Sequence, residues 1–128
     1  MIELFTLNAL APMRLLRAAL PSLRESAAAG HDPFVAHISA VVAEQPQAGM
    51  AAYSASKAAL AAYDAAAARE LRREKIRLID IRPPHTETGL AQRPLAGTAP
   101  RLPQGLDPQQ VADRILAALL EGEKDVPS

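Results

Sequence analysis

The sequence contains no cysteine, and its three histidines have no compact spacing of the kind that binds a metal. Disulfide bonds and thiolate-bound metals are therefore excluded, and a zinc site is not expected. Neither the basic nor the acidic residues form a long run, and their numbers are equal, at fourteen each. A near-neutral chain of this kind predicts no surface for nucleic acid or for an anionic membrane.

The sequence also lacks a long apolar run and a secretion signal. No apolar segment approaches the roughly 20 residues that a membrane-spanning helix needs. Glu3 lies where a signal peptide would carry basic residues. At 128 residues the chain forms one domain at most. We therefore expect a soluble, cytoplasmic protein that does not bind membranes.

The first segment of the chain has the apolar spacing of an amphipathic helix. Leucines and alanines recur at helical intervals from about residue 3 to residue 24. Pro12 lacks a backbone N–H and predicts a kink or a bent start, and Pro21 is expected to weaken the last turn. Small and polar residues at 25–32 then predict a turn.

The rest of the chain alternates between strand-like and helix-like segments. The apolar segments 34–39 and 76–81 predict buried strands, and the alanine-rich segment 51–74 predicts a long helix between them. A last helix is expected to begin at Asp107, because Pro108 suits the first helical position. The order strand, helix, strand predicts a parallel α/β unit with a right-handed crossover.

Tyr53 and Lys57 are four residues apart within the predicted long helix, so they lie one turn from each other on the same face. A tyrosine titrates near pH ~10, and a nearby positive charge favours the phenolate and lowers that pKa. We therefore expect Tyr53 to exchange a proton near neutral pH. The spacing alone is common on exposed helices, so the flanking residues decide between the two interpretations.

Those flanking residues, Gly-Met-Ala-Ala-Tyr-Ser-Ala-Ser-Lys-Ala-Ala-Leu at 49–60, resemble the Tyr-x-x-x-Lys element of the short-chain dehydrogenase/reductase family. The resemblance implies a partial Rossmann-like, doubly wound parallel sheet. It also implies NAD or NADP as cofactor and a small carbonyl or alcohol as substrate. Tyr53 would donate or accept the proton, and Lys57 would be its electrostatic partner and a contact to the cofactor ribose.

Three further features follow from the same resemblance. Asn8 lies in a segment, 8–14, that resembles the family segment whose asparagine supports a proton-relay water chain to the lysine. Thr88 falls where the family places a threonine on the nicotinamide carboxamide, although Pro84 replaces a family glycine shortly before it. The helix at 51–74 corresponds to one that packs across a subunit interface, which implies a homo-oligomer.

The family's catalytic serine has no unambiguous counterpart. Counting back from Tyr53 at the family spacing reaches Ala40, whereas Ser39 is one residue too far upstream. Successive side chains of a strand point to opposite faces, so this offset matters. The register favours Ala40 at the catalytic position, and one extra residue in the loop 41–50 would restore Ser39. The loss of such a donor typically lowers the rate by a factor of about 10² to 10³.

The resemblance covers only the C-terminal half of the family's usual length. The six glycines are scattered and form no glycine-rich turn for a cofactor pyrophosphate. We therefore expect residues 1–128 to form one partial domain of an NAD(P)-dependent oxidoreductase, weakly active or inactive alone. A fragment or mis-started reading frame, a half-domain that pairs with another chain, and a decayed enzyme all remain possible explanations. The alternative function is a non-catalytic α/β subunit that pairs through its alanine-rich helix.

Overall fold

A computed structural model of the chain describes residues 2–84, 105–123 and 125–127. The elements follow in the order α1 (Ile2–Phe5), the π-helical segment η1 (Thr6–Leu10), α2 (Ala11–Ala28), β1 (Phe34–Ile38), the 3₁₀ turn η2 (Val41–Ala43), α3 (Ala51–Arg72), β2 (Arg77–Ile81), α4 (Pro108–Glu121) and β3 (Asp125–Val126). No helix in the described ranges is long and apolar enough to cross a membrane.

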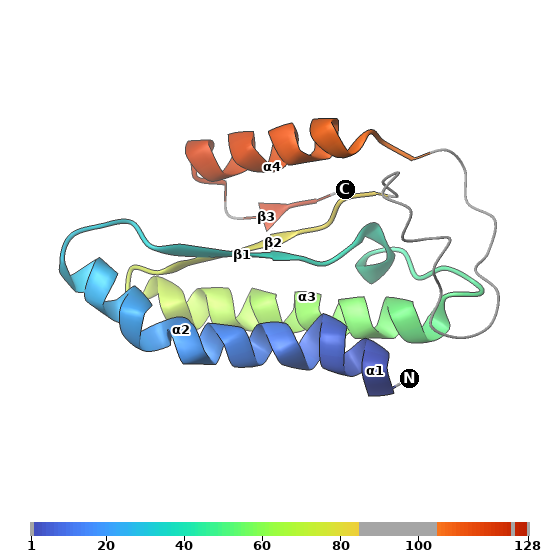
Figure 1. Ribbon diagram of the computed structural model, residues 1–128, viewed down its shortest axis with the longest axis horizontal. Coiled ribbons are helices and arrows are strands. Elements are labelled where there is room, and N and C mark those ends of the chain that lie inside the picture. The colour runs from blue at the N-terminus through green and yellow to red at the C-terminus, as the bar shows by residue number, and fades with distance from the viewer. Residues whose placement is uncertain (1, 85–104, 124, 128) are drawn as a thin grey trace.

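The strands form a parallel sheet in the order β1-β2-β3, with β2 in the centre. Helices α2 and α3 cover one face of this sheet and α4 covers the other (Figure 1). The predicted fold class, a partial doubly wound parallel sheet, is therefore confirmed. In this topology β1 forms one edge of the described sheet, and its carboxyl end lies beside the start of α3.

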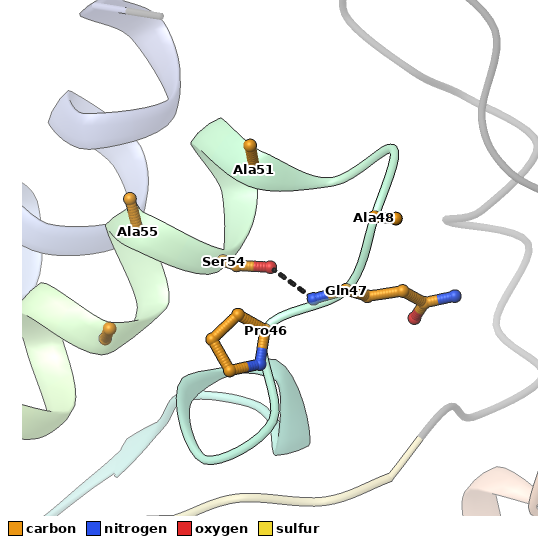
Figure 2. Close-up of a pocket in the computed structure, with 7 residues that line it drawn as sticks. Pro46, Gln47, Ala48, Ala51, Ser54 and Ala55 are labelled. Carbon is orange, nitrogen blue, oxygen red and sulfur yellow. Dashed lines mark hydrogen bonds between the residues drawn. The ribbon is translucent and has the colours of Figure 1, made fainter.

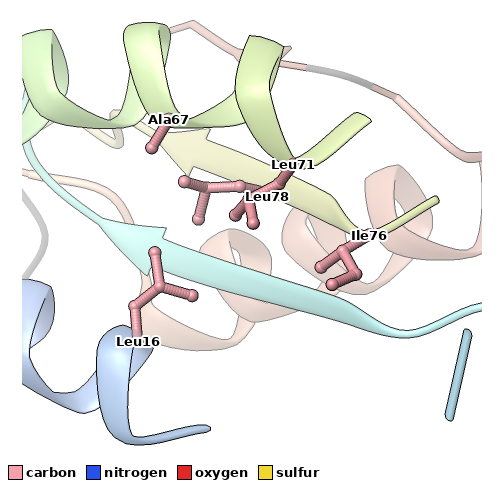
Figure 3. Packing of buried hydrophobic residues seen from close by; sticks show 5 residues of the cluster. All are labelled: Leu16, Ala67, Leu71, Ile76 and Leu78. Atoms are coloured by element: carbon pink, nitrogen blue, oxygen red, sulfur yellow. The ribbon is translucent and has the colours of Figure 1, made fainter. Parts of the chain in front are cut away.

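The central strand carries mainly apolar side chains on both faces, as expected for a covered parallel strand, and Asp80 is its buried polar exception. Leu78 points to the α2 and α3 side, where it packs in the larger core cluster (Figure 3). Its neighbours Ile79 and Ile81 point to the opposite side and pack against α4 and β3. Because successive side chains of β2 point to opposite faces of the sheet, this one strand contributes to both core clusters. The larger cluster consists of Leu16, Ala67, Leu71, Ile76 and Leu78.

The N-terminal helix has an irregular start before Pro12, in line with its prediction, and it ends later than predicted. The π-helical turn Thr6–Leu10 lies immediately before Pro12, and Ala11 donates its N–H to the Thr6 carbonyl five residues back. Pro12 has no N–H of its own, so the wider turn occurs where the regular ladder is already interrupted. At the other end α2 continues through Pro21 to Ala28, although a turn was predicted from residue 25. Leucine and alanine side chains beyond Pro21 pack on the larger core and stabilise the extra turn.

The strands differ from their predictions in two ways. Both long strands are one residue shorter than expected, so Ser39 follows β1 instead of ending it. The short strand β3 was not predicted, because two residues are too few to show a pattern. Gly122 ends α4 with a left-handed backbone, φ +73°, and so allows the chain to turn back toward β2.

Candidate active site

One stripe of α3 faces the sheet, and it changes character along the helix. Its C-terminal part is apolar, and Ala67 and Leu71 pack in the larger core. Its N-terminal part carries Tyr53, Lys57 and the buried Asp64, spaced so that they lie on this same face. The helix therefore packs on the sheet through apolar residues near its end, and it places ionisable groups on the same face nearer its start.

Tyr53 and Lys57 lie on the same face of α3, as their spacing predicts, and Lys57 reaches the carboxyl end of β1. The Lys57 Nζ atom is 5.9 Å from the centre of the Tyr53 ring. It donates a hydrogen bond of 3.1 Å to the carbonyl of Ile38, the last residue of β1. The Tyr53 hydroxyl has no hydrogen-bond partner among the residues that the structure describes. The fold thus places the phenol of Tyr53 and the ammonium of Lys57 near the end of β1.

The expected lowering of the Tyr53 pKa by Lys57 is wrong for this structure. Burial raises the pKa of Tyr53 above its usual value, because burial penalises the phenolate. The Lys57 ammonium is committed to the Ile38 carbonyl and contacts the ring. Burial lowers the pKa of Lys57 itself, and the negative charge of Asp80 partly offsets that effect.

Asn8 is held against the helix that carries Tyr53 and Lys57. Its amide Nδ2 donates a hydrogen bond of 3.1 Å to the Ser56 hydroxyl, which in turn donates to the Tyr53 carbonyl at 2.7 Å. Asn8 and Lys57 also line one cavity of about 570 Å³ between α2, α3 and β1. Asn8 lies in the π-helical turn, a local geometry that is frequent at functional sites. Its relay role remains a prediction.

The Ser39 hydroxyl points into the protein. It is 3.2 Å from Oδ2 of Asp80 and 3.3 Å from the Ile81 carbonyl, and it donates to these acceptors. No hydrogen bond joins it to Tyr53 within the described part of the chain. The backbone of Ala40 is extended, with φ −169° and ψ 161°, so its side chain points away from that of Ser39. The predicted cofactor contact Thr88 lies outside the described residues.

A second cavity, of about 410 Å³, adjoins the start of α3 on a different side (Figure 2). Alanines and Pro46 form most of its wall, and Ser54 accepts a hydrogen bond of 3.4 Å from the Gln47 backbone N–H there. Neither Tyr53 nor Lys57 lines it. This cavity is therefore mainly apolar, and the two acid-base groups of the candidate site do not line it.

Sequence reasoning missed a buried polar group next to Lys57. His37 of β1 contacts Asp64 of α3, with Nδ1 and Oδ1 2.7 Å apart, and Asp80 of β2 lies on the same face of the sheet. All three residues are buried. Polar residues inside segments predicted to be buried strands were the available signal, and Asp64 continues the stripe that begins at Tyr53.

Known proteins resemble this chain in sequence and in structure. The model of the short chain dehydrogenase family matches residues 1–97. Comparison with curated proteins finds no match. Among solved structures, a short-chain dehydrogenase from Streptomyces avermitilis is 28% identical with a TM-score of 0.78, and the match covers 97% of this chain and 51% of that one.

Two other solved structures are similar. A short-chain dehydrogenase from Sphingobium yanoikuyae in complex with NADPH is 27% identical with a TM-score of 0.78, and the match covers 95% of this chain and 46% of that one. A short chain dehydrogenase from Burkholderia cenocepacia in complex with NADP is 24% identical with a TM-score of 0.78, and the match covers 96% and 47%. The chain thus spans about half the length of these proteins. With the family model matching residues 1–97, the chain belongs to the short-chain dehydrogenase family.

Proposed function

We propose that the chain supplies the proton-transfer part of an NAD(P)-dependent oxidoreductase that interconverts a small carbonyl compound and an alcohol. The observation that carries this proposal is the position of Tyr53 beside Lys57, at the carboxyl end of β1, with no partner for the Tyr53 hydroxyl among the described residues. Ligands of parallel α/β sheets bind at the carboxyl ends of the strands. Membership of the family and the relative solved with NADPH support the same activity.

Tyr53 is the acid in the reduction and the base in the oxidation. Its raised pKa keeps the phenol protonated at neutral pH, so it has a proton to donate to a carbonyl oxygen. The positive charge of Lys57 favours the phenolate that remains after donation. Asn8 supports the return of a proton from solvent through the cavity that it shares with Lys57.

The residues present fit one end of a nicotinamide cofactor. The Lys57 ammonium and the Tyr53 hydroxyl are donors suited to a ribose, and Thr88 is the proposed contact to the carboxamide. When bound, the nicotinamide supplies or accepts the hydride. No glycine-rich turn between a strand and a helix occurs in the described ranges, so these residues do not provide a pyrophosphate site. We therefore propose that residues 1–128 act as a partial domain with low activity alone.

Ser39 contributes to this activity only if its hydroxyl leaves Asp80. In its present position the hydroxyl is buried and donates toward Asp80 and Ile81, away from Tyr53. A missing donor to the developing oxyanion lowers a rate by a factor of about 10² to 10³. This is a second reason to expect slow turnover.

A pair of tyrosine variants tests the proposal. Purified chain is incubated with NADH or NADPH and a set of small ketones, and loss of the reduced nicotinamide is followed by absorbance. Tyr53→Phe removes the proposed acid, and we expect turnover to fall at least about 10²-fold. Tyr63→Phe removes the other tyrosine of α3, which lies beside the larger core, and should leave turnover within about twofold.

Binding is measured separately, because a partial domain can bind without turning over. A cofactor that binds only the folded chain raises its thermal midpoint. We expect one of the two nucleotides to raise it in the unmodified chain and in Tyr63→Phe, and to do so less in Lys57→Ala. Turnover that survives Tyr53→Phe, or the absence of both binding and turnover, would contradict the proposal.

A second candidate function is a non-catalytic subunit that pairs through α3. The observation that favours it is the row of alanines on the outward face of this helix, which is exposed: Ala55, Ala62, Ala65 and Ala66. Small side chains allow another helix to approach the backbone closely. The oligomeric state, treated in the Discussion, distinguishes a pairing role from a monomeric one.

A further inference from the structure

Two carboxyl groups are buried together between α3 and the sheet, behind the candidate site. The side chain of Asp64 is 1% exposed and that of Asp80 is 7% exposed. A buried carboxylate is stable only when hydrogen bonds or opposite charges compensate for the lost water. Their partners therefore determine which of the two groups can carry a charge.

Each carboxyl has one oxygen with partners and one without. Oδ1 of Asp64 is 2.7 Å from His37 Nδ1. Oδ2 of Asp80 accepts hydrogen bonds from the Ser39 hydroxyl and from the Arg82 guanidinium. The remaining oxygens, Oδ2 of Asp64 and Oδ1 of Asp80, are buried and have no hydrogen-bond partner.

The two groups are neighbours, because Asp80 lies opposite His37 in the sheet and His37 contacts Asp64. Burial is the main cause that raises the pKa of Asp64 to about 6, and the neighbouring Asp80 carboxyl raises it further, against the opposing effect of His37. An ionised carboxylate only accepts hydrogen bonds, so two ionised groups cannot satisfy each other. One proton between them would give both unpartnered oxygens a hydrogen bond.

We propose that Asp64 and Asp80 share one proton, and that this proton sets the negative charge which Asp80 presents to Lys57 and Ser39. In this arrangement Asp80 is a positioning residue. Its charge holds the Lys57 ammonium in the protonated form, against the effect of burial, and its Oδ2 atom orients the Ser39 hydroxyl. That consequence for catalysis rests on the proposed function, whereas the shared proton does not.

Groups on every neighbouring element enter this equilibrium. They are His37 and Ser39 at β1, Lys57 and Tyr63 on α3, Arg82 after β2, and, through Arg82, Glu44 and Asp125. Arg82 contacts Asp80 directly and so favours a negative charge on Asp80 rather than on Asp64. The proton is therefore expected to reside mainly on Asp64.

Carbon-detected NMR of the aspartate side chains tests the inference on the full chain without any cofactor. We expect the carboxyl carbons of Asp64 and Asp80 to shift together at one pH near 6. Asp80→Asn should move the Asp64 midpoint down by about one pH unit or more, because it removes a neighbouring negative charge. Asp113→Asn should leave the midpoint unchanged.

The same titration gives a separate readout for the positioning role. Asp80→Asn should also lower the pH at which the Lys57 side-chain nitrogen titrates, an effect that a purely structural role would not produce. Separate titrations of Asp64 and Asp80 in the unmodified chain, with Asp64 near pH ~4, would overturn the shared proton even if Asp80→Asn fails to fold. A chain that shows the shared proton but binds no nucleotide would sink the proposed function and leave this inference standing.

Discussion

Asp64 makes the folded chain bind a proton that the unfolded chain releases. Its pKa is raised to about 6 in the folded state, whereas an aspartate in an unfolded chain titrates near ~3.9. The folded chain therefore binds this proton more tightly between these two values. Stability contributed by the group is present below pH ~4 and is lost as pH rises toward about 6.

Asp64→Asn should remove this loss, because an amide does not ionise. The gap between the two pKa values corresponds to about 3 kcal/mol. We expect the stability of the variant relative to the unmodified chain to increase by about 2 to 3 kcal/mol between pH ~4 and pH ~7. Urea unfolding at several pH values measures this difference, and contributions from acids that are not coupled to Asp64 cancel in the comparison. A difference that stays constant with pH, as expected for Asp113→Asn, would contradict the assignment.

At the scale of elements, Arg82 connects three segments. Its guanidinium pairs with Asp125 of β3 at 2.6 Å, with Glu44 after η2 at 2.5 Å and with Asp80 of β2. Its own backbone N–H donates to the Val126 carbonyl at 2.9 Å. Because β3 has only two residues, this arginine supplies much of what holds it to the sheet.

Arg82→Gln should therefore destabilise the fold by about 3 kcal/mol, because it leaves the buried Asp80 with an uncompensated charge. It should also release β3, so that the amide of residue 82 exchanges with solvent at least tenfold faster. Arg114→Gln is the matched control: its ion pair with Glu123 is exposed to solvent, so its loss should hardly change the stability of the fold. Equal effects of the two substitutions on urea unfolding and on amide exchange would show that Arg82 has no special role.

At the scale of the whole molecule, the exposed alanine face of α3 predicts self-association. Ala62 lies near the middle of this face. Ala62→Arg adds a long charged side chain and hardly changes helix propensity, so it should weaken pairing without unfolding the helix. We expect the dissociation constant of the dimer to rise at least about tenfold, which corresponds to about 1.4 kcal/mol.

Analytical ultracentrifugation over a range of concentrations measures this equilibrium. Ala112→Arg, at an exposed position of α4, serves as the control and should associate like the unmodified chain. An unmodified chain that stays monomeric throughout, or an Ala62→Arg variant that associates normally, would rule out pairing through this face.

Local patterns account for the elements that carry the site. Helical spacing predicts α3 and therefore the proximity of Tyr53 and Lys57, and apolar β-branched residues predict β1 and β2 within one residue of their ends. Such features depend on neighbours in the chain, so they can be recognised without tertiary structure. The extension of α2 past residue 24 and the strand β3 were missed, because each is stabilised by packing or pairing with a distant segment.

The sequence by itself determined the parallel α/β class, the Tyr53 and Lys57 pair and the family resemblance. Each of these depends on residues that are close together in the chain. Only the tertiary structure decided that Lys57 bonds the Ile38 carbonyl, that Ser39 turns toward Asp80, and that burial raises the pKa of Tyr53. It also decided that His37, Asp64 and Asp80, far apart in the chain, meet as one buried group. Burial and electrostatic coupling depend on which elements pack together, and this is why no local pattern revealed them.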